Sequence, residues 1–260
     1  MDTMPTITEA SPALTMPWRR LLGAYAAEAR SECLRYMRAP GFMLPMLLFS
    51  TVFYLMFGVL LNHGDASRYL LASYSAFGIM GPGLFGFGVS LAIERDGGLL
   101  TLKRALPMPP GAYLLGKMAM AMIAATVVTV LLLLIGVLLA QVVLDWRQMV
   151  ALMLCGTFGV LPFCALGMLV GTLIKGQGAP GLLNLVYLPM AFLSGLWLPL
   201  SMLPQALQKL APVWPSYHLN QLTLAAVGMH TGTLLPHVLA LSGYTAIFLA
   251  VAVRRLRRHG

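Results

Sequence analysis

Six hydrophobic runs without a single Asp, Glu, Lys or Arg dominate what this chain can fold into. They cover residues 41–61, 69–93, 118–144, 149–174, 180–200 and 234–253. A helix needs about 20 apolar residues to cross the hydrocarbon core of a bilayer, which is roughly 30 Å thick, and each run is long enough. We therefore predict an all-α integral membrane protein with six transmembrane helices.

The few charged residues set the predicted orientation. Only 10% of the chain is charged, whereas a soluble domain averages about 25%. Of the 17 Lys and Arg residues, all but Arg68, Arg147 and Lys209 fall on the side of the predicted membrane that holds both termini. The positive-inside rule makes that side cytosolic and predicts a multi-pass protein of the cytoplasmic (inner) membrane. The net charge of +9 then indicates membrane lipids as partners, not nucleic acid.

Two segments precede the first hydrophobic run. Residues 1–17 lack a basic start and an apolar core, so they predict a flexible cytosolic tail and not a secretory signal. Residues 18–39 predict an amphipathic helix at the membrane interface, with Glu32 and the arginines placed away from its apolar side. That apolar side is predicted to contain Leu22, Tyr25, Ala29, Cys33 and Tyr36. Residues 40–260 are then the six-helix transmembrane domain.

The charged segment at residues 94–117 separates the second hydrophobic run from the third. Leu99, Leu102 and Leu106 recur at helical spacing, and the prolines at 107, 109 and 110 end the pattern. We predict a short cytosolic amphipathic helix that docks another protein. Another proline-broken but apolar segment, residues 201–233, predicts short re-entrant or external helices between the fifth and sixth spans.

Several apparent site motifs predict no chemistry. Residues 111–118 match a phosphate-binding loop at seven of eight positions, but Met118 replaces the required Ser or Thr. We instead expect the start of the third span there, with Lys117 at the level of the lipid headgroups. Glycines at residues 81–88 and 167–171 predict close helix packing. The three cysteines predict no disulfide framework, the five histidines lack metal-ligand spacing, and His237 is expected to stand alone.

The uncharged runs also leave no visible residue for coupling transport to ion or proton flow. A transporter built from them must receive work from another protein. A membrane enzyme is a weaker alternative, because no carboxylate lies in any run. A non-transporting assembly or sensor module that docks a cytosolic partner is the other alternative.

Three stretches together resemble the permease subunits of ABC-2-type transporters, including drug-resistance and lipo-oligosaccharide exporters. They are ERDGGLLTLKRALPMPPGAYLLGKM at residues 94–118, FLSGLWLP followed by LP at 192–204, and the stretch from Ala211-Pro212 to Tyr217. The resemblance implies six spans, a cytosolic coupling helix and a permease homodimer bound to two cytosolic ABC ATPase subunits. It implies that ATP and Mg bind those partners, with no cofactor on this chain, which is then not an enzyme by itself.

The resemblance also assigns site residues. It places the ATPase-coupling element at Glu94, Arg95, Asp96, Gly97, Lys103 and Arg104. It places an external gate at Pro199, Pro204 and Tyr217. Trp214 departs from the pattern, because the family often has a small or polar residue there.

Aromatic residues in the runs suggest a route for hydrophobic or amphiphilic cargo such as a drug, lipid or glycolipid. The candidates are Tyr54, Phe57, Tyr74, Phe77, Phe192 and Trp197. Each is equally compatible with packing or with contact to lipid. The predicted function is the permease subunit of an exporter powered by a separate ATPase.

Overall fold

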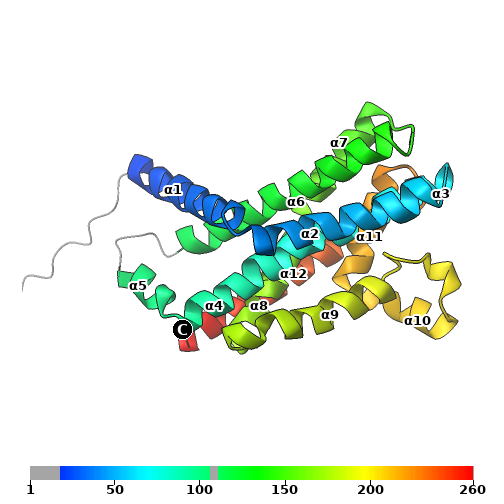
Figure 1. Cartoon of the computed structure of the whole chain (residues 1–260). Coiled ribbons are helices and arrows are strands. Elements are labelled where there is room, and N and C mark those ends of the chain that lie inside the picture. The colour runs from blue at the N-terminus through cyan, green and yellow to red at the C-terminus, as the bar shows by residue number, and fades with distance from the viewer. Residues whose placement is uncertain (1–17, 106–110, 260) are drawn as a thin grey trace, which may run out of the picture.

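The computed structural model describes residues 18–105 and 111–259, and within these ranges it contains helices and no strand (Figure 1). This confirms the predicted all-α class. The predicted tail at residues 1–17 and the three prolines at 107, 109 and 110 lie outside the described residues. So do the side chains of Phe42, Thr101, Arg104, Ala105 and residues 257–259.

The first half of the bundle contains two long helices with π-helical segments. The elements are α1 (Trp18–Met37), α2 (Pro40–Phe53) with π-helix η1 (Tyr54–Leu60), α3 (Asp65–Gly81) with π-helix η2 (Pro82–Val89), α4 (Ser90–Asp96) and α5 (Leu99–Ala105). The second half follows as α6 (Ala112–Leu138), α7 (Trp146–Phe158), α8 (Leu161–Leu173), α9 (Ala179–Leu193), α10 (Gln205–Leu210), α11 (Pro215–Ala226) and α12 (Leu235–His259). Short 3-10 turns, η3 (Gly176–Gly178), η4 (Leu200–Met202) and η5 (Ala211–Val213), connect some of them.

Within the described residues, five helical stretches are long and apolar enough to cross a membrane. They are Met43–Leu60, Asp65–Asp96, Ala112–Leu138, Trp146–Leu173 and Leu235–Leu256. They match five of the six predicted runs and make the chain a multi-pass membrane protein. The remaining run, residues 180–200, contains α9, whose 15 residues extend about 22 Å. Helix length alone therefore does not make α9 a sixth span.

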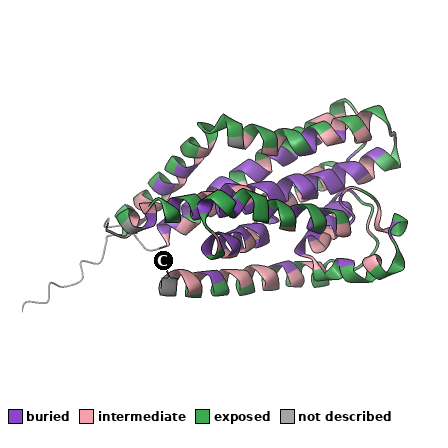
Figure 2. Cartoon of the chain, turned by 60° about the horizontal axis from the view of Figure 1, so that its bottom comes forward, coloured by how far each residue is buried: buried purple, intermediate pink, exposed green. Residues whose placement is uncertain are grey.

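The stretch Asp65–Asp96 is the central helix of the bundle and is almost entirely buried. Figure 2 shows buried residues running through the middle of the molecule and exposed residues on its outer faces. Glycines let α8 approach this helix closely, as the sequence predicts: a Cβ on Gly167 would lie 2.6 Å from the Gly83 carbonyl oxygen, and one on Gly88 would lie 2.8 Å from the Gly167 carbonyl oxygen. The close contact fixes α8 against the central helix.

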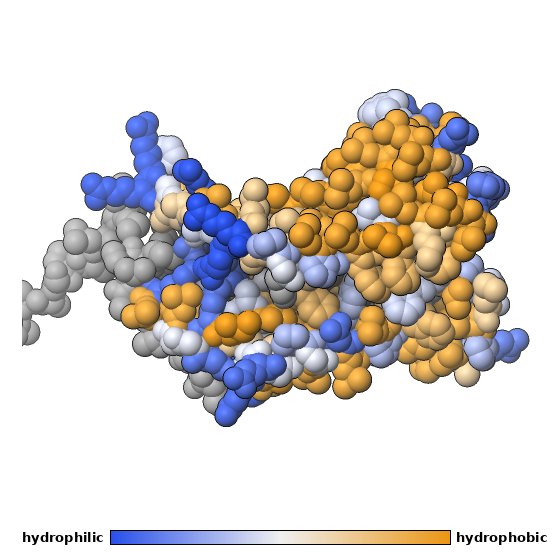
Figure 3. Space-filling model, viewed as in Figure 1, coloured by the Kyte–Doolittle hydropathy of each residue, from blue (hydrophilic) through white to orange (hydrophobic). Residues whose placement is uncertain are grey.

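The two ends of the bundle differ in composition. Helices α1 and α5 and the C-terminus lie at one end, which we call the charged end (Figure 1). The opposite end holds the turn before α3, the start of α7, and α10. Figure 3 shows hydrophilic side chains gathered near the charged end and hydrophobic ones over much of the remaining surface. This asymmetry agrees with the uneven distribution of Lys and Arg in the sequence.

Helix α1 packs against α6 at the charged end. The predicted apolar side is partly correct, because Tyr25, Ala29 and Cys33 are half-buried. Leu22, in contrast, is 56% exposed. The placement of Glu32 away from that side is wrong, because its side chain is buried. A buried carboxylate needs a cation beside it, and the structure supplies one.

Candidate functional site

Lys117, in the second turn of α6, lies at the centre of a buried group of charges. Its ammonium nitrogen Nζ is 3.0 Å from Oε2 of Glu32 on α1 and 2.8 Å from Oε1 of Glu94 on α4. It also donates a 2.8 Å hydrogen bond to the hydroxyl of Ser90. Lys117 is fully buried, so its ammonium group contacts protein groups, and its predicted level in the membrane stays a prediction. Its environment is protein.

Further charges surround this pair of contacts. Arg35 on α1 bridges Glu94 and Glu32, the second at 2.7 Å. Lys103 on α5 contacts Glu28 and lies 3.2 Å from Glu32. We call Glu28, Glu32, Arg35, Glu94, Lys103 and Lys117 the Lys117 cluster. Its three carboxylates and three cations balance each other, which is the condition for keeping charges inside a protein.

Tyr113 completes the interior of the cluster. Its hydroxyl donates to Oε2 of Glu94, and the ammonium groups of Lys103 and Lys117 lie 4.4 and 5.1 Å from its ring centroid. These distances are within the range of cation–π attraction. The cluster thus joins α1, α4, α5 and α6 through ionic contacts. Removing one member leaves an uncompensated charge that is expensive to bury.

The residues after Glu94 attach α4 to the connection between α8 and α9. Arg95 donates to the backbone carbonyls of Thr172 and Ile174, the second at 2.9 Å. The Asp96 carboxylate accepts from the Gly176 backbone N–H. Helix α4 then ends, and Gly98 in the turn has a φ of +73°, a conformation that glycine adopts without strain.

An open groove of about 740 Å³ lies beside this attachment. Its lining residues are Ile93, Asp96, Gly97, Lys175, Gly176, Gln177 and Pro180. The predicted coupling residues therefore divide between two places. Glu94 and Lys103 belong to the Lys117 cluster, Arg95, Asp96 and Gly97 lie at or near the groove, and the side chain of Arg104 lies outside the described residues.

At the opposite end, an aromatic cavity of about 660 Å³ opens between the end of the first long helix and the segment after α9. Four predicted path residues line it, namely Phe57, Tyr74, Phe192 and Trp197. The predicted gate residue Pro199 lines it as well. The remaining lining residues are Phe53, Asn62, Asp65, Ala66, Tyr69, Leu70, Leu198, Met202 and Met229.

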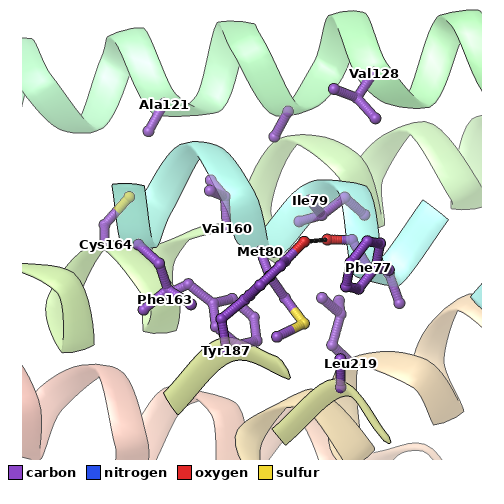
Figure 4. Packing of buried hydrophobic residues seen from close by; sticks show 14 of the residues in the cluster. Phe77, Ile79, Met80, Ala121, Val128, Val160, Phe163, Cys164, Tyr187 and Leu219 are labelled. Atoms are coloured by element: carbon purple, nitrogen blue, oxygen red, sulfur yellow. Dashed lines mark hydrogen bonds between the residues drawn. The ribbon is translucent and has the colours of Figure 1, made fainter. Parts of the chain in front are cut away.

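A second cavity of about 660 Å³, the inner cavity, lies nearer the charged end between α2 and α9. Phe49 and Tyr187 are among its lining residues. Between the two cavities lies Phe77, whose ring centroid is 4.8 Å from Tyr187, 5.6 Å from Phe49 and 5.7 Å from Trp197. Tyr187 donates a 3.1 Å hydrogen bond to the Phe77 carbonyl, and Figure 4 draws it as a dashed line. These four rings form an aromatic barrier between the cavities.

The other path and gate candidates lie elsewhere. Tyr54 is fully buried, and its hydroxyl oxygen would be 3.2 Å from a Cβ built on Gly136 of α6, so it fills the helix interface. Pro204 is exposed immediately before α10. Tyr217 contacts histidines on α11 and α12 and does not line the aromatic cavity.

A family model described as ABC-2 type transporter matches residues 24–250 of the chain. The chain belongs to this family. Over 193 residues it is 28% identical to the protein named "Putative transport permease YvfS" of Bacillus subtilis (strain 168). The matched region covers 72% of this chain and 79% of that relative. The match confirms the resemblance inferred from the motifs. It makes the chain a membrane-spanning subunit of an ABC transporter.

The sequence did not point to four of the six members of the Lys117 cluster in this ABC-2 type protein, nor to Tyr113. Glu28, Glu32, Arg35, Tyr113 and Lys117 were not predicted as site residues. One signal was present: the chain has only eight acidic residues, and Glu28 and Glu32 lie four positions apart on one helical face. When acidic residues are this scarce and lie on a helix face that also carries apolar residues, they are candidates for buried ion pairs with Lys or Arg.

Proposed function

We propose that the chain is the permease of an ABC exporter that moves a hydrophobic or amphiphilic cargo, such as a drug, lipid or glycolipid. In this proposal two copies form a homodimer bound to two cytosolic ATPase subunits, which bind ATP and Mg. The complex lies in the cytoplasmic (inner) membrane, with both termini and the charged end in the cytosol. The excess of Lys and Arg at that end supports this orientation.

The observation that carries the proposal is the Lys117 cluster. Lys103 connects α5 to Glu28 and Glu32 of α1, and Lys117 connects both Glu32 and Glu94 to α6. A displacement of α4 and α5 by a partner would therefore carry α1 and the start of α6 with it. Such concerted movement is what rigid-body gating requires.

The groove beside Asp96 and Gly97 is the proposed binding site for the ATPase. Arg95 and Asp96 attach this surface to the backbone at residues 172–176, so a subunit bound there would press on α8 and α9 as well. The cluster pairs its buried charges with one another. That pairing favours an external energy source over proton relay within the bundle.

The proposed cargo route is the groove between α2 and α9. Both cavities open from it, and they are lined mainly by apolar and aromatic groups, which suits a cargo of low polarity. Both helices also carry exposed apolar side chains, including Leu48 and Leu185. We propose that the second copy covers this face in the homodimer, and that the aromatic barrier around Phe77 separates inward-facing and outward-facing halves of the route.

We further propose that α9 and the turn after it form a sixth crossing. The segment begins beside Gly176, which bonds to Asp96 near the charged end. After α9, the carbonyl of Gly195 accepts a 2.8 Å hydrogen bond from Tyr69 near the start of α3. The segment therefore extends between the two ends of the central helix, although its regular helix is short.

Reconstitution of the chain with its ATPase in lipid vesicles tests this function. We expect a stable complex whose ATP hydrolysis rises when cargo is added. Arg95→Glu combined with Arg104→Glu should remove that stimulation, because the reversed charges oppose the backbone carbonyls and the predicted docking surface. The matched control, Arg147→Glu, changes an exposed arginine at the opposite end and should retain the stimulation.

Other outcomes identify the alternatives. A stable complex whose rate of ATP hydrolysis does not change with any cargo tested would favour the assembly or sensor role. The absence of a complex, or full stimulation in the double variant, would contradict the coupling assignment.

A further inference from the structure

Three histidines, from α11, α12 and the connection between them, meet at the opposite end of the bundle. Nδ1 of His218 on α11 lies 2.9 Å from Nδ1 of His237 in the first turn of α12. The ring of His230, from the connection between these helices, has its centroid 5.6 Å from that of His237. The expectation that His237 stands alone is therefore wrong. We call these three residues the histidine cluster.

The hydrogen bonds determine where the protons reside. His218 Nε2 is 2.9 Å from the Pro212 carbonyl oxygen, and because a carbonyl only accepts, this nitrogen carries a hydrogen. A neutral His218 then has a bare Nδ1, which accepts from the Nδ1–H of His237. The contact tolerates one added proton, on Nε2 of His237. A second added proton makes both rings cationic, so both Nδ1 atoms carry hydrogens and two N–H groups and two positive charges face each other.

No anion compensates for such charges in the described part of the chain, where no ion pair joins these rings to a carboxylate. No group of three or more His, Cys, Asp or Glu among the described residues is arranged to hold a metal ion. The titratable neighbours are Tyr217 and Tyr244, with ring centroids 5.4 and 6.2 Å from His218. Arg68 of α3 is directed to Gln148 and the Val143 carbonyl. The other charged residues of this end, Asp65, Asp145, Arg147 and Lys209, make no bond to the rings.

The opposite side of α11 bonds to the wall of the aromatic cavity. The hydroxyls of Ser216 and Ser194 form a hydrogen bond, and the Asn220 amide is 3.3 Å from the Gly195 carbonyl oxygen. Residues 194–195 lead directly into Trp197, which lines that cavity. Helix α11 thus lies between the histidine cluster and the cavity wall, and a shift of α11 is transmitted to the wall.

We infer that the histidine cluster is a proton-sensitive latch that holds α11 against α12 when its rings are neutral and releases α11 when a second proton is bound. Its structural part is independent of the proposed function, while its consequence for cargo release rests on that function. The ligand is the proton itself, so the latch would make the outer wall of the cavity respond to the pH at this end.

The direction of the pH effect follows from burial. Burial lowers the pKa of His218 below its ordinary value of 6.5, and the hydrogen bond to Pro212 acts in the opposite direction. A released His218 regains its ordinary pKa and therefore binds protons more readily than the latched one. The latch is favoured above pH 6.5 and weakens as the pH falls below that value.

Amide hydrogen exchange of the full chain in lipid nanodiscs at pH 7.5 and 5.5 tests the latch without ATPase or cargo. The measured quantity is the exchange rate of residues 215–226 divided by the exchange rate of α6 in the same sample. This ratio removes the intrinsic pH dependence of amide exchange. We expect a relative increase at pH 5.5 of up to about tenfold, the limit for a released ring of ordinary pKa 6.5 when the latched ring does not bind the proton. His218→Gln combined with His237→Gln should abolish the increase, because amides do not titrate.

The matched control is His63→Gln, which removes an exposed histidine outside the cluster and should keep the full increase. An unchanged wild-type ratio at pH 5.5 would overturn the latch, as would an equal increase in the double variant. If only the reconstituted ATP hydrolysis fails to respond to cargo, the proposed function is contradicted. The hydrogen-exchange result then still supports the latch.

Discussion

The Lys117 cluster and the aromatic cavity occupy opposite ends of the bundle and satisfy their buried polar groups in opposite ways. In the cluster, every carboxylate has a cation beside it, and Lys117 has three partners. Eight buried side-chain polar atoms lack a partner among the described residues, and none belongs to the cluster. Trp197 Nε1, at the cavity, and the hydroxyl of Tyr54 are two of them.

The difference indicates two mechanical roles. A balanced set of buried charges has few alternative arrangements, because any separation exposes unpaired charge to a medium of low polarity. The indole N–H of Trp197, which has no partner and lies at the cavity, loses little when it moves. By this criterion the charged end resists internal rearrangement and the cavity wall permits it, as the proposed exporter mechanism requires.

The largest expected effect concerns the cluster. Lys117→Met leaves the three carboxylates of the cluster with only two cations, Arg35 and Lys103, and should lower the free energy of unfolding by about 3–5 kcal/mol. Unfolding in mixed micelles with increasing SDS measures this change. Lys175→Met, at an exposed lysine of the same end, should have almost no effect.

Combining Lys117→Met with Glu94→Gln should recover part of the loss, since Glu28 and Glu32 are then balanced by Arg35 and Lys103. An unaltered unfolding midpoint in Lys117→Met would show that the charged end does not depend on its ion pairs, and the comparison would fail.

An intermediate effect is expected where α8 meets the central helix that joins the two ends. Gly167→Ala places a Cβ within 2.6 Å of the Gly83 carbonyl oxygen and should destabilise the chain by about 1–3 kcal/mol. The same SDS titration checks it. Gly181→Ala on α9, where a Cβ would meet nothing within 4 Å, should be neutral or slightly stabilising. Equal behaviour of the two variants would contradict the close backbone contact.

The smallest effect is expected at the cavity. Trp197→Phe removes an indole N–H that has no partner and keeps an aromatic ring, so stability should change by less than about 1 kcal/mol. Trp146→Phe, at a tryptophan that is 70% exposed, provides the reference in the same measurement. A loss as large as that of Lys117→Met would mean that the cavity is as tightly constrained as the cluster.

Hydropathy was sufficient to predict much of the fold. Five of the predicted runs coincide with helices long enough to span a membrane, because the absence of charge over 20 residues leaves few other structures available. The run at residues 180–200 was harder to assign. Gly195, with a φ of +76°, turns the chain there, and hydropathy does not register such a turn.

The candidate site was predicted less completely, and for a physical reason. Periodicity on α1 sorts residues by polarity, so it assigned Glu32 to the polar side, whereas the partner that makes its burial possible, Lys117, is 85 positions away. The sequence missed the histidine cluster for the same reason. His218, His230 and His237 meet only after α11 has packed against α12. Contacts of this kind depend on tertiary packing, which a local pattern does not contain.

The exact balance of charge in the Lys117 cluster has an electrical consequence. A single unpaired charge that moves across the full membrane potential exchanges about 2.3 kcal/mol with the field for every 100 mV. Three carboxylates and three cations that move together exchange none. Displacement of the cluster would therefore add no voltage dependence of its own, whereas a protonated histidine cluster would carry net charge and respond to the membrane potential.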